Sequence, residues 1–391
     1  MATRTGTIRS ETPQSAADAA ELLRGCADDG VAVRIAGAGT KAWGLPGAEC
    51  GVQLHTAGLD AIVEHNRGDL TAVVQAGVSL RELDELLAAA GQMLPLDAAH
   101  GAGDGATVGG AIATGDSGPL RHRFGAARDL VLGVTVALSD GSVAQAGGKV
   151  IKNVAGYDLA KLYSGSFGTL GLITQVAVRL QPRAPALATA TGRTDDPGEL
   201  QDAAIALASS SLEAQALDVR WEGGHGMVLG RFAGIAAGEQ AAAAQRLLAA
   251  AGVEAATVDE DDELWARQRA QQRCADAAGA VVRVSGRPTQ LAAACVATQV
   301  AGATLVGRGA LGVSWIALPP AAPGELVTAI ARVRKVLAPS ACVVLDAPAY
   351  VRAHLDPWDH VEDAGLVLMR RVKQRFDPTA TCNPGLFVGG I

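Results

Sequence analysis

The sequence predicts a two-domain protein whose first half is α/β and whose second half is α+β. The chain has 391 residues, and a typical domain has about 100–200. Up to Pro182, buried strands alternate with amphipathic helices and Gly-rich loops. From residue 183 such loops become rare and β-like runs alternate with Ala-rich helices, which is typical of helices on one face of an antiparallel sheet.

The composition indicates a globular protein with a small-molecule partner. Hydrophobic residues make up 49% and charged residues 19% of the chain, so we expect a sizeable core and exclude a disordered protein. The 33 basic and 40 acidic residues give a net charge of −7, which disfavours binding to nucleic acid or anionic lipid.

The sequence predicts a cytoplasmic protein without a membrane span. Its first twenty residues are polar and lack the apolar core of a secretion signal. No uninterrupted run of about 18 apolar residues occurs, so contact with the inner face of a membrane is expected only through partners. The six cysteines are scattered without a CxxC pair or metal-ligand spacing, and we expect reduced thiols and no bound metal.

The first predicted elements are a helix, a strand and a Gly-rich loop. Thr12 as N-cap and Pro13 at the first helical position begin the helix, and Gly30 ends it. The apolar run 31–36 predicts a short buried strand, which leads directly into the loop Gly37-Ala38-Gly39-Thr40-Lys41.

A strand and a capped helix follow, and then a long segment without a clear element. The strand is expected at 71–77, and Ser79 with Glu82 forms a capping box for a helix that Gly91 ends. Residues 95–125 are dense in Gly, Ala, Thr and Asp. Few compact domains keep such a segment unless it binds something.

A hairpin and one more strand complete the first domain. The runs 130–138 and 142–146 flank Asp140-Gly141, which is a strong hairpin signal. The third strand is expected at 170–180, immediately before Pro182.

We therefore divide the chain into a first domain, 1–182, a second domain, 183–350, and a C-terminal helix and tail, 351–391. Only a weak indication of an internal repeat is present, a strand–helix–strand unit that recurs in the second domain. The strands expected in that domain are 216–221, 227–232, 281–285, 304–307, 313–318 and 342–347.

The loop Gly37-Ala38-Gly39-Thr40-Lys41 has the chemistry of an anion-binding cradle. Its glycines let backbone N–H groups approach phosphate oxygens, and its Thr and Lys add a hydroxyl donor and a positive charge. By itself the loop also fits a simple turn. Gly37, Gly39 and Ala42 match the spacing of the dinucleotide-binding fingerprint, but the Pro and two Gly at 43–47 disfavour the helix that this motif requires.

A second segment of small residues, 105–114, strengthens the case for a binding groove. Residues without large side chains let an extended ligand lie against the main chain. Together the segments 37–41 and 105–114 suggest a groove for a long cofactor with a pyrophosphate in its middle.

The ordered motifs of the first domain resemble the FAD-binding (PCMH-type) domain of the vanillyl-alcohol oxidase superfamily. The resemblance implies an α+β fold, in which a two-subdomain FAD-binding domain precedes a smaller α+β cap domain with an antiparallel sheet. Residues 152–159 and the ending 376–385 are most similar to the E-subunit family of bacterial glycolate oxidases. The motifs, in chain order, are Gly37-Ala38-Gly39-Thr40-Lys41, Pro95-Leu96-Asp97, Gly105-Ala106-Thr107-Val108-Gly109-Gly110, Arg123-Phe124-Gly125, Asp140-Gly141, 153–159 and 165–174.

The resemblance implies a cofactor site built from three segments. The first would wrap the FAD pyrophosphate, the second would line the flavin and its ribityl chain, and the third would close the groove. Family members often attach flavin covalently through His or Cys, but neither occurs in 34–41, so we expect non-covalent FAD. The implied residues are Gly37, Ala38, Gly39, Thr40, Lys41, Thr107, Gly109, Gly110, Thr114, Ser117, Gly118, Gly168, Thr169, Gly171 and Ile173.

No catalytic residue is assigned, although two are candidates. His100 is a candidate base or else an ordinary loop residue. Arg283 lies in an apolar strand and needs an anion, either a substrate carboxylate or an acid such as Asp276. The His-rich metal site of related D subunits has no counterpart, since His225 stands alone in an expected surface turn, and the basic cluster 121–123 is by default a solvated or structural feature.

Three functions remain open at this point. The first is the FAD-binding subunit of a glycolate oxidase-like complex, which oxidises a small 2-hydroxy acid such as glycolate or D-lactate beside a second flavin subunit and an iron–sulfur subunit. The second is a self-sufficient FAD oxidase or dehydrogenase of a hydroxy acid, aldonolactone or sugar. The third is a non-catalytic scaffold that keeps the flavin fold. A spectrum of the isolated chain with added substrate would separate them.

Overall fold

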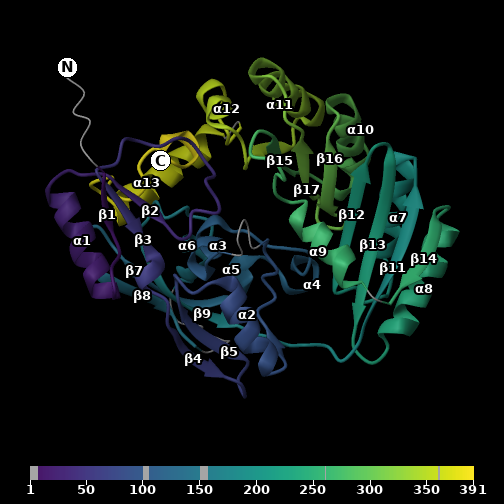
Figure 1. Cartoon of the computed structure of the whole chain (residues 1–391), viewed down its shortest axis with the longest axis horizontal. Helices are drawn as coiled ribbons and strands as arrows, with labels where there is room; N and C mark the ends of the chain where they lie inside the picture. The colour runs from purple at the N-terminus through teal and green to yellow at the C-terminus, as the bar shows by residue number, and fades with distance from the viewer. Residues whose placement is uncertain (1–7, 100–104, 150–156, 260, 360–361) are drawn as a thin grey trace. The chain divides into compact units, whose positions relative to one another are not determined.

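The computed structural model describes residues 8–99, 105–149, 157–259, 261–359 and 362–391. These residues form two compact units, which Figure 1 shows. The first unit takes in the described parts of Met1–Ser117, Gly125–Arg183 and Val361–Ile391, and the second those of Gly118–Phe124 and Ala184–His360. The chain thus leaves the first unit after residue 183 and returns to it with its C-terminal segment.

A small parallel sheet opens the first unit, in the order β1 (Arg9–Glu11), β3 (Val52–His55), β2 (Val33–Ala36). Helix α1 (Ala16–Asp28) shares a buried core with this sheet through Leu23. The helix begins at Ala16 rather than at Pro13, because the Ser15 hydroxyl accepts a hydrogen bond from the backbone N–H of Asp18 at 3.1 Å and so provides the cap.

The second sheet of this unit has five antiparallel strands, and it contains the predicted hairpin. Ser79 caps α2 (Leu80–Ala89) by accepting a hydrogen bond from the N–H of Glu82, as its capping box predicts. Gly141 adopts a φ of 84° in the hairpin turn. The strand order is β4 (Ile62–Asn66), β5 (Thr71–Gln75), β9 (Leu172–Arg179), β7 (Val131–Ala137), β8 (Val143–Gly147), and the short strands β6 (Gln92–Met93) and β10 (Gln181–Pro182) pair separately.

The segment expected to lack regular structure contains short helices. Thr107 caps α3 by accepting a hydrogen bond from the N–H of Gly110, and Gly115 ends it with a φ of 64°. Both are ordinary helix signals, and the high Gly content concealed them. The short helices here and beyond are α3 (Val108–Thr114), α4 (Arg121–Phe124), α5 (Ala127–Leu130) and α6 (Ala160–Tyr163).

The C-terminal segment packs beside the first sheet. After α13 (Asp363–Phe376) the chain turns, and Cys382 forms a parallel bridge with Val33 of β2. In Figure 1 this yellow segment lies against the purple strands β1 and β2. Residues from the two ends of the sequence therefore share one core, in which Cys382 is fully buried.

The second unit is built on an eight-stranded antiparallel sheet. Two of its strands, β11 and β14, are not anticipated by the sequence pattern. The strand order is β14 (Glu254–Val258), β11 (Leu187–Thr194), β13 (His225–Ala233), β12 (Ala216–Glu222), β16 (Thr304–Arg308), β17 (Val313–Leu318), β15 (Ala280–Ser285), β18 (Ala341–Val344).

This sheet consists of two copies of one motif, which strengthens the weak indication of a repeat. The chain runs strand–helix–strand–strand–helix–strand from β11 to β14 and again from β15 to β18. The second copy has the strand order of the first reversed, and β12 and β16 join the two. The four helices bury one face of the sheet in a single core, and they are α7 (Pro197–Ala208), α8 (Ala237–Ala250), α10 (Leu291–Ala301) and α11 (Pro323–Leu337).

The sequence predicts helices on one face of the sheet, but the structure has a helix on the other face as well. Helix α9 (Asp262–Ala270) packs on the opposite face, where Trp265 contacts Ala216 and Leu229. Arg231 binds Asp261 through two hydrogen bonds of 3.1 and 2.6 Å at the start of this helix. The second unit also contains α12 (Ala349–His354), the short helix η3 (Pro288–Gln290) and α4, while η1 (Thr56–Gly58) and η4 (Val388–Gly390) belong to the first unit.

Candidate functional site

The first two Gly-rich segments meet in the first unit. A Cβ atom built on Gly37 would lie 2.5 Å from the Thr107 hydroxyl oxygen, which is too close for any real side chain. Gly37 is therefore required by the approach of residue 107 to the end of β2. The sequence prediction that two separated segments converge is confirmed by this contact.

A buried ion pair joins the same two segments a second time. Lys41 Nζ lies 3.5 Å from an Asp116 carboxylate oxygen, and the two side chains are 5% and 7% exposed. Asp116 also accepts a hydrogen bond from the N–H of Ser117 at 2.9 Å. A buried Lys needs a negative partner, and here the partner comes from the end of the second segment.

The loop 37–41 has open space beside Gly39. Gly39 has a φ of 70°, and nothing lies within 4 Å of the position where its Cβ would be. No helix occurs among the described residues between this loop and η1, which agrees with our rejection of the dinucleotide-binding fingerprint. The loop thus has the space and the backbone conformation that an anion cradle requires.

Two of the predicted cofactor residues on α3 have internal roles as well. A Cβ on Gly109 would lie 2.5 Å from the Cβ of Ala76, so this glycine allows α3 to pack on the end of β5. The Thr114 hydroxyl donates a hydrogen bond to the carbonyl of Gly110 at 2.8 Å. We infer that Gly109 contributes to the site through the position of the helix.

The third predicted segment is attached to the C-terminal end of α3. The N–H of Gly165 donates to the carbonyl of Ile112 at 3.0 Å, and that of Phe167 donates to the carbonyl of Ala113 at 2.8 Å. Gly168 and Gly171 have φ values of 69° and 139°, as a tight Gly-rich turn requires. All three predicted segments therefore lie together in the first unit.

The side chains of this third segment face inward. Thr169 is 2% exposed and its hydroxyl donates to the carbonyl of Ser166 at 2.7 Å, and Ile173 is part of the buried core. The hydroxyl of Ser166 is buried and has no hydrogen-bond partner among the described residues. An unsatisfied buried hydroxyl in this loop suits a ligand with hydrogen-bonding groups.

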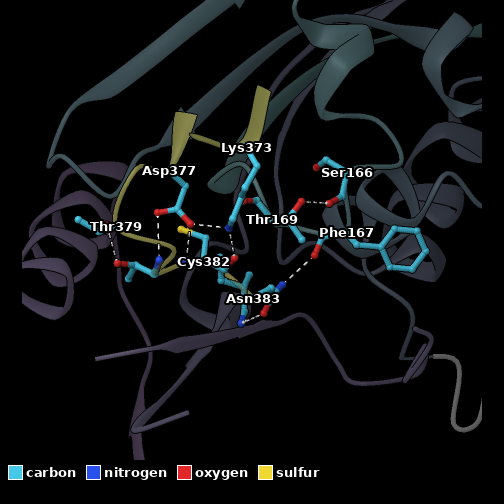
Figure 2. Close-up of polar contacts among 10 residues, drawn as sticks. Ser166, Phe167, Thr169, Lys373, Asp377, Thr379, Cys382 and Asn383 are labelled. Carbon is cyan, nitrogen blue, oxygen red and sulfur yellow. Dashed lines mark hydrogen bonds and ion pairs between the residues drawn. The ribbon is translucent and has the colours of Figure 1, made fainter. Parts of the chain in front are cut away.

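The C-terminal tail is hydrogen-bonded to this loop, a contact that the sequence does not predict (Figure 2). Lys373 Nζ donates to the carbonyl of Thr169 at 2.7 Å and binds Asp377 at 2.5 Å. The Asn383 side chain donates to the carbonyl of Phe167 at 2.8 Å. The only sequence signal was the ending 376–385, to which no role was given.

Gly118 belongs to the second unit, whereas the other predicted cofactor residues belong to the first. Its carbonyl accepts a hydrogen bond from Arg308 Nε at 3.2 Å. Arg308 also binds Asp218 at 2.5 Å, with both side chains fully buried, and its guanidinium lies 4.7 Å from the ring centroid of Trp315. No local sequence pattern predicts this buried pair.

Of the two candidate catalytic residues, the structure describes only Arg283. His100 lies outside the described residues. Arg283 is half-buried on β15, opposite Trp315 on one neighbouring strand and Val343 on the other. His225 is at the surface, 2.6 Å from Asp195. The role of Arg283 as a carboxylate ligand stays a prediction.

The basic cluster 121–123 forms α4 in the second unit. Arg123 makes an exposed ion pair with Glu213 at 3.0 Å, which fits the structural role given to it by default. Burial, with a smaller contribution from the charge of Arg123, lowers the pKa of His122 below its usual value. His122 is therefore held in its neutral form.

The cysteines are free and mostly buried. Cys26, Cys295, Cys342 and Cys382 are buried and the other two are half-buried. Burial raises the pKa of Cys295 to about 12 and that of Cys342 to about 11, so these thiols stay protonated. The described residues contain no group of three or more His, Cys, Asp or Glu side chains placed to hold a metal ion. Among them, no helix combines the length and the apolar character that crossing a bilayer demands.

Comparison with known proteins finds similarities mainly to the first unit. Residues 11–147 match the family of FAD binding domains. Glycolate oxidase subunit GlcE of Escherichia coli (strain K12) is 37% identical over 177 residues, which are 43% of this chain and 49% of that protein. Glycolate oxidase subunit GlcD of Bacillus subtilis (strain 168) is 33% identical over 175 residues, which are 44% of this chain and 36% of that one.

The mitochondrial D-lactate dehydrogenase [cytochrome] of Arabidopsis thaliana is 35% identical over 43% of this chain and 29% of its own length. The chain thus matches about half or less of the length of these relatives. A solved structure of alkyldihydroxyacetonephosphate synthase has a TM-score of 0.71 and 15% identity over 95% of this chain and 76% of that one. This last similarity shows the fold alone.

Proposed function

We propose that the chain is the FAD-binding subunit of a glycolate oxidase-like complex. The match of residues 11–147 to the family of FAD binding domains supports this proposal, and so do the motifs that resemble the vanillyl-alcohol oxidase superfamily. The substrate is a small 2-hydroxy acid, glycolate or D-lactate, and the product is the 2-oxo acid. The electrons pass to an iron–sulfur subunit beside a second flavin subunit. The similarity to proteins named glycolate oxidase subunits supports this assignment.

The observation that carries the proposal is the meeting of three glycine-rich segments in the first unit. Gly37 touches Thr107, Lys41 pairs with Asp116, and Phe167 is hydrogen-bonded to Ala113. These contacts support a shared site to which the loop 37–41 would contribute backbone N–H groups, the buried Lys41 cation and the open position at Gly39. Such a set fits a long ligand that carries a pyrophosphate.

The chain's own residues would bind and orient the cofactor. Residues 37–41 would hold the pyrophosphate with their N–H groups and with Lys41, whose charge is balanced by Asp116. Thr107, Gly110 and Ser117 would line the flavin and its ribityl chain, with residues 168–173 closing the groove. Bound FAD supplies the two-electron acceptor for the hydride that leaves C2 of the substrate as the hydroxyl loses its proton.

The cysteines support an iron–sulfur partner only in one respect. The six cysteines of the chain have no cluster-binding spacing, so a cluster that accepts the electrons would have to lie on another subunit. We therefore place the cluster on another subunit.

The test is a visible absorption spectrum of the purified chain before and after anaerobic addition of glycolate or D-lactate. We expect bound, non-covalent flavin that is bleached only when partner subunits are present. Bleaching of the isolated chain would instead establish a self-sufficient enzyme. A chain that takes up no FAD under any condition would leave only the scaffold function.

A further inference from the structure

The C-terminal tail is hydrogen-bonded to the chain on either side of the first Gly-rich loop, before it and after it. The carbonyl of Thr381 accepts a hydrogen bond from the N–H of Val33 at 2.8 Å, and the N–H of Asn383 donates to the carbonyl of Val33 at 2.9 Å. Beyond the loop, the N–H of Leu45 donates to the carbonyl of Leu386 at 2.9 Å. The same short tail therefore fixes the chain both before and after residues 37–41.

One side chain of the tail connects this loop to the third segment. The Asn383 amide oxygen accepts a hydrogen bond from the N–H of Ile35 at 2.8 Å, and its NH2 group donates to the carbonyl of Phe167 at 2.8 Å. Ile35 lies two residues before Gly37, and Phe167 lies directly before Gly168. A Cβ on Gly168 would lie 2.8 Å from the Asn383 nitrogen, so the three elements are in close contact.

The third segment is held in a strained conformation at this contact. Phe167 has a φ of 56°, which is unfavourable for a large side chain and persists only where the surroundings enforce it. Asn383 fixes its carbonyl, and the ring of Phe387 lies 5.3 Å from its ring, centroid to centroid. The tail thus supplies the interactions that keep this segment in place.

The tail itself is fixed by a buried charge network, shown in Figure 2. Lys373 Nζ donates to the carbonyls of Thr169 and Cys382 at 2.7 and 2.8 Å and to Asp377 at 2.5 Å. The Asp377 carboxylate accepts the N–H groups of Thr381 and Cys382 at 3.1 and 2.8 Å. All three donors of the Lys373 ammonium are used, so its position is determined.

From these contacts we propose that the segment 373–387 acts as a clamp that sets the spacing between the loop 37–41 and the loop 165–169, and that Asn383 and Lys373 are positioning residues for the FAD site. The inference rests on the proposed cofactor site. It adds a reciprocal requirement, because a tail that improves FAD binding must itself be stabilised when FAD binds.

The first experiment compares two single substitutions in the tail by titration with FAD. Asn383→Asp keeps an oxygen for the N–H of Ile35 but sets a second acceptor against the carbonyl of Phe167, so we expect the FAD dissociation constant to rise about tenfold or more. Thr379→Ala is the matched control, because it removes a tail hydrogen bond to Thr381 of 2.8 Å that touches neither loop. The control is expected to bind FAD like the wild type.

The second experiment measures amide hydrogen exchange in the wild-type chain with and without FAD. We expect exchange in residues 377–391 to slow by a larger factor than exchange in α1, which reports general stabilisation of the same unit. This measurement decides the matter if the Asn383→Asp chain does not fold.

The outcomes distinguish failure of the clamp proposal from failure of the proposed cofactor site. A wild-type chain that takes up no FAD would overturn both. A wild-type chain that binds FAD, together with unchanged affinity in folded Asn383→Asp or with equal slowing in the tail and α1, would overturn the clamp alone.

Discussion

The substitution Gly37→Ala tests the convergence of the two Gly-rich segments directly. Gly37 does not have a positive φ, so alanine meets no backbone strain there. Its new Cβ would lie 2.5 Å from the Thr107 hydroxyl oxygen and 3.6 Å from the Thr107 Cβ. Only the hydroxyl oxygen therefore clashes, and removal of that atom should relieve the clash.

The expected energies follow from this geometry. Inserting one carbon into a closed contact costs about 1–3 kcal/mol. Thr107→Ala removes the hydroxyl that accepts the N–H of Gly110 at 3.1 Å, and loss of such a helix cap costs about 0.5–2 kcal/mol. In the double variant the clash is absent, so the free energy of unfolding should exceed the additive value by about 1–3 kcal/mol.

The assay is urea unfolding of the cofactor-free single and double variants, followed through the transition that added FAD stabilises. Gly39→Ala is the control, since its φ is 70° and nothing lies within 4 Å of its Cβ position. Its cost comes from backbone conformation, about 1–2 kcal/mol, and should be additive with that of Thr107→Ala. Additive energies for Gly37→Ala and Thr107→Ala would refute the contact, and with it the argument for a shared site.

Three further outcomes are expected. Lys41→Gln should weaken FAD binding about tenfold, because a charge-assisted contact to the pyrophosphate is lost, whereas Lys161→Gln at the surface should leave the titration unchanged. Arg308→Met should destabilise the second unit by about 3–5 kcal/mol because it removes the guanidinium that pairs with the buried Asp218 carboxylate, and adding Asp218→Leu should recover most of this loss in thermal unfolding. The pKa of His122 is lowered from its usual 6.5 in the folded chain, so the unfolded chain binds the proton more readily and stability should fall as the pH drops below about 6.5. His122→Gln should remove that part of the pH dependence, and an unchanged urea midpoint profile would contradict it.

The sequence was sufficient for elements whose signals are local. The hairpin at Asp140-Gly141 and the capped helix at Ser79 are found as predicted, since turn and cap chemistry act within a few residues. Strands β11 and β14 were missed because they are recognisable only by their partners in the sheet. Helix α3 was missed because its glycines, which suggest a loop, are required by packing on β5.

By itself the sequence predicted two kinds of domain, an FAD-binding domain in the first half and the Gly-rich segments expected to hold the cofactor, because these predictions depend on short motifs and composition. The match of residues 11–147 to FAD binding domains agrees with the second of them. Only the tertiary structure shows which contacts require particular residues in the Gly-rich segments. Gly37 lies against Thr107, and Lys41 forms an ion pair with Asp116. The carbonyl of Phe167 accepts a hydrogen bond from Asn383, which lies more than two hundred residues away along the chain. The pairing of Phe167 with Asn383 arises from the return of the chain to its first unit. No local pattern encodes any of the three contacts, because each partner is brought near only by folding.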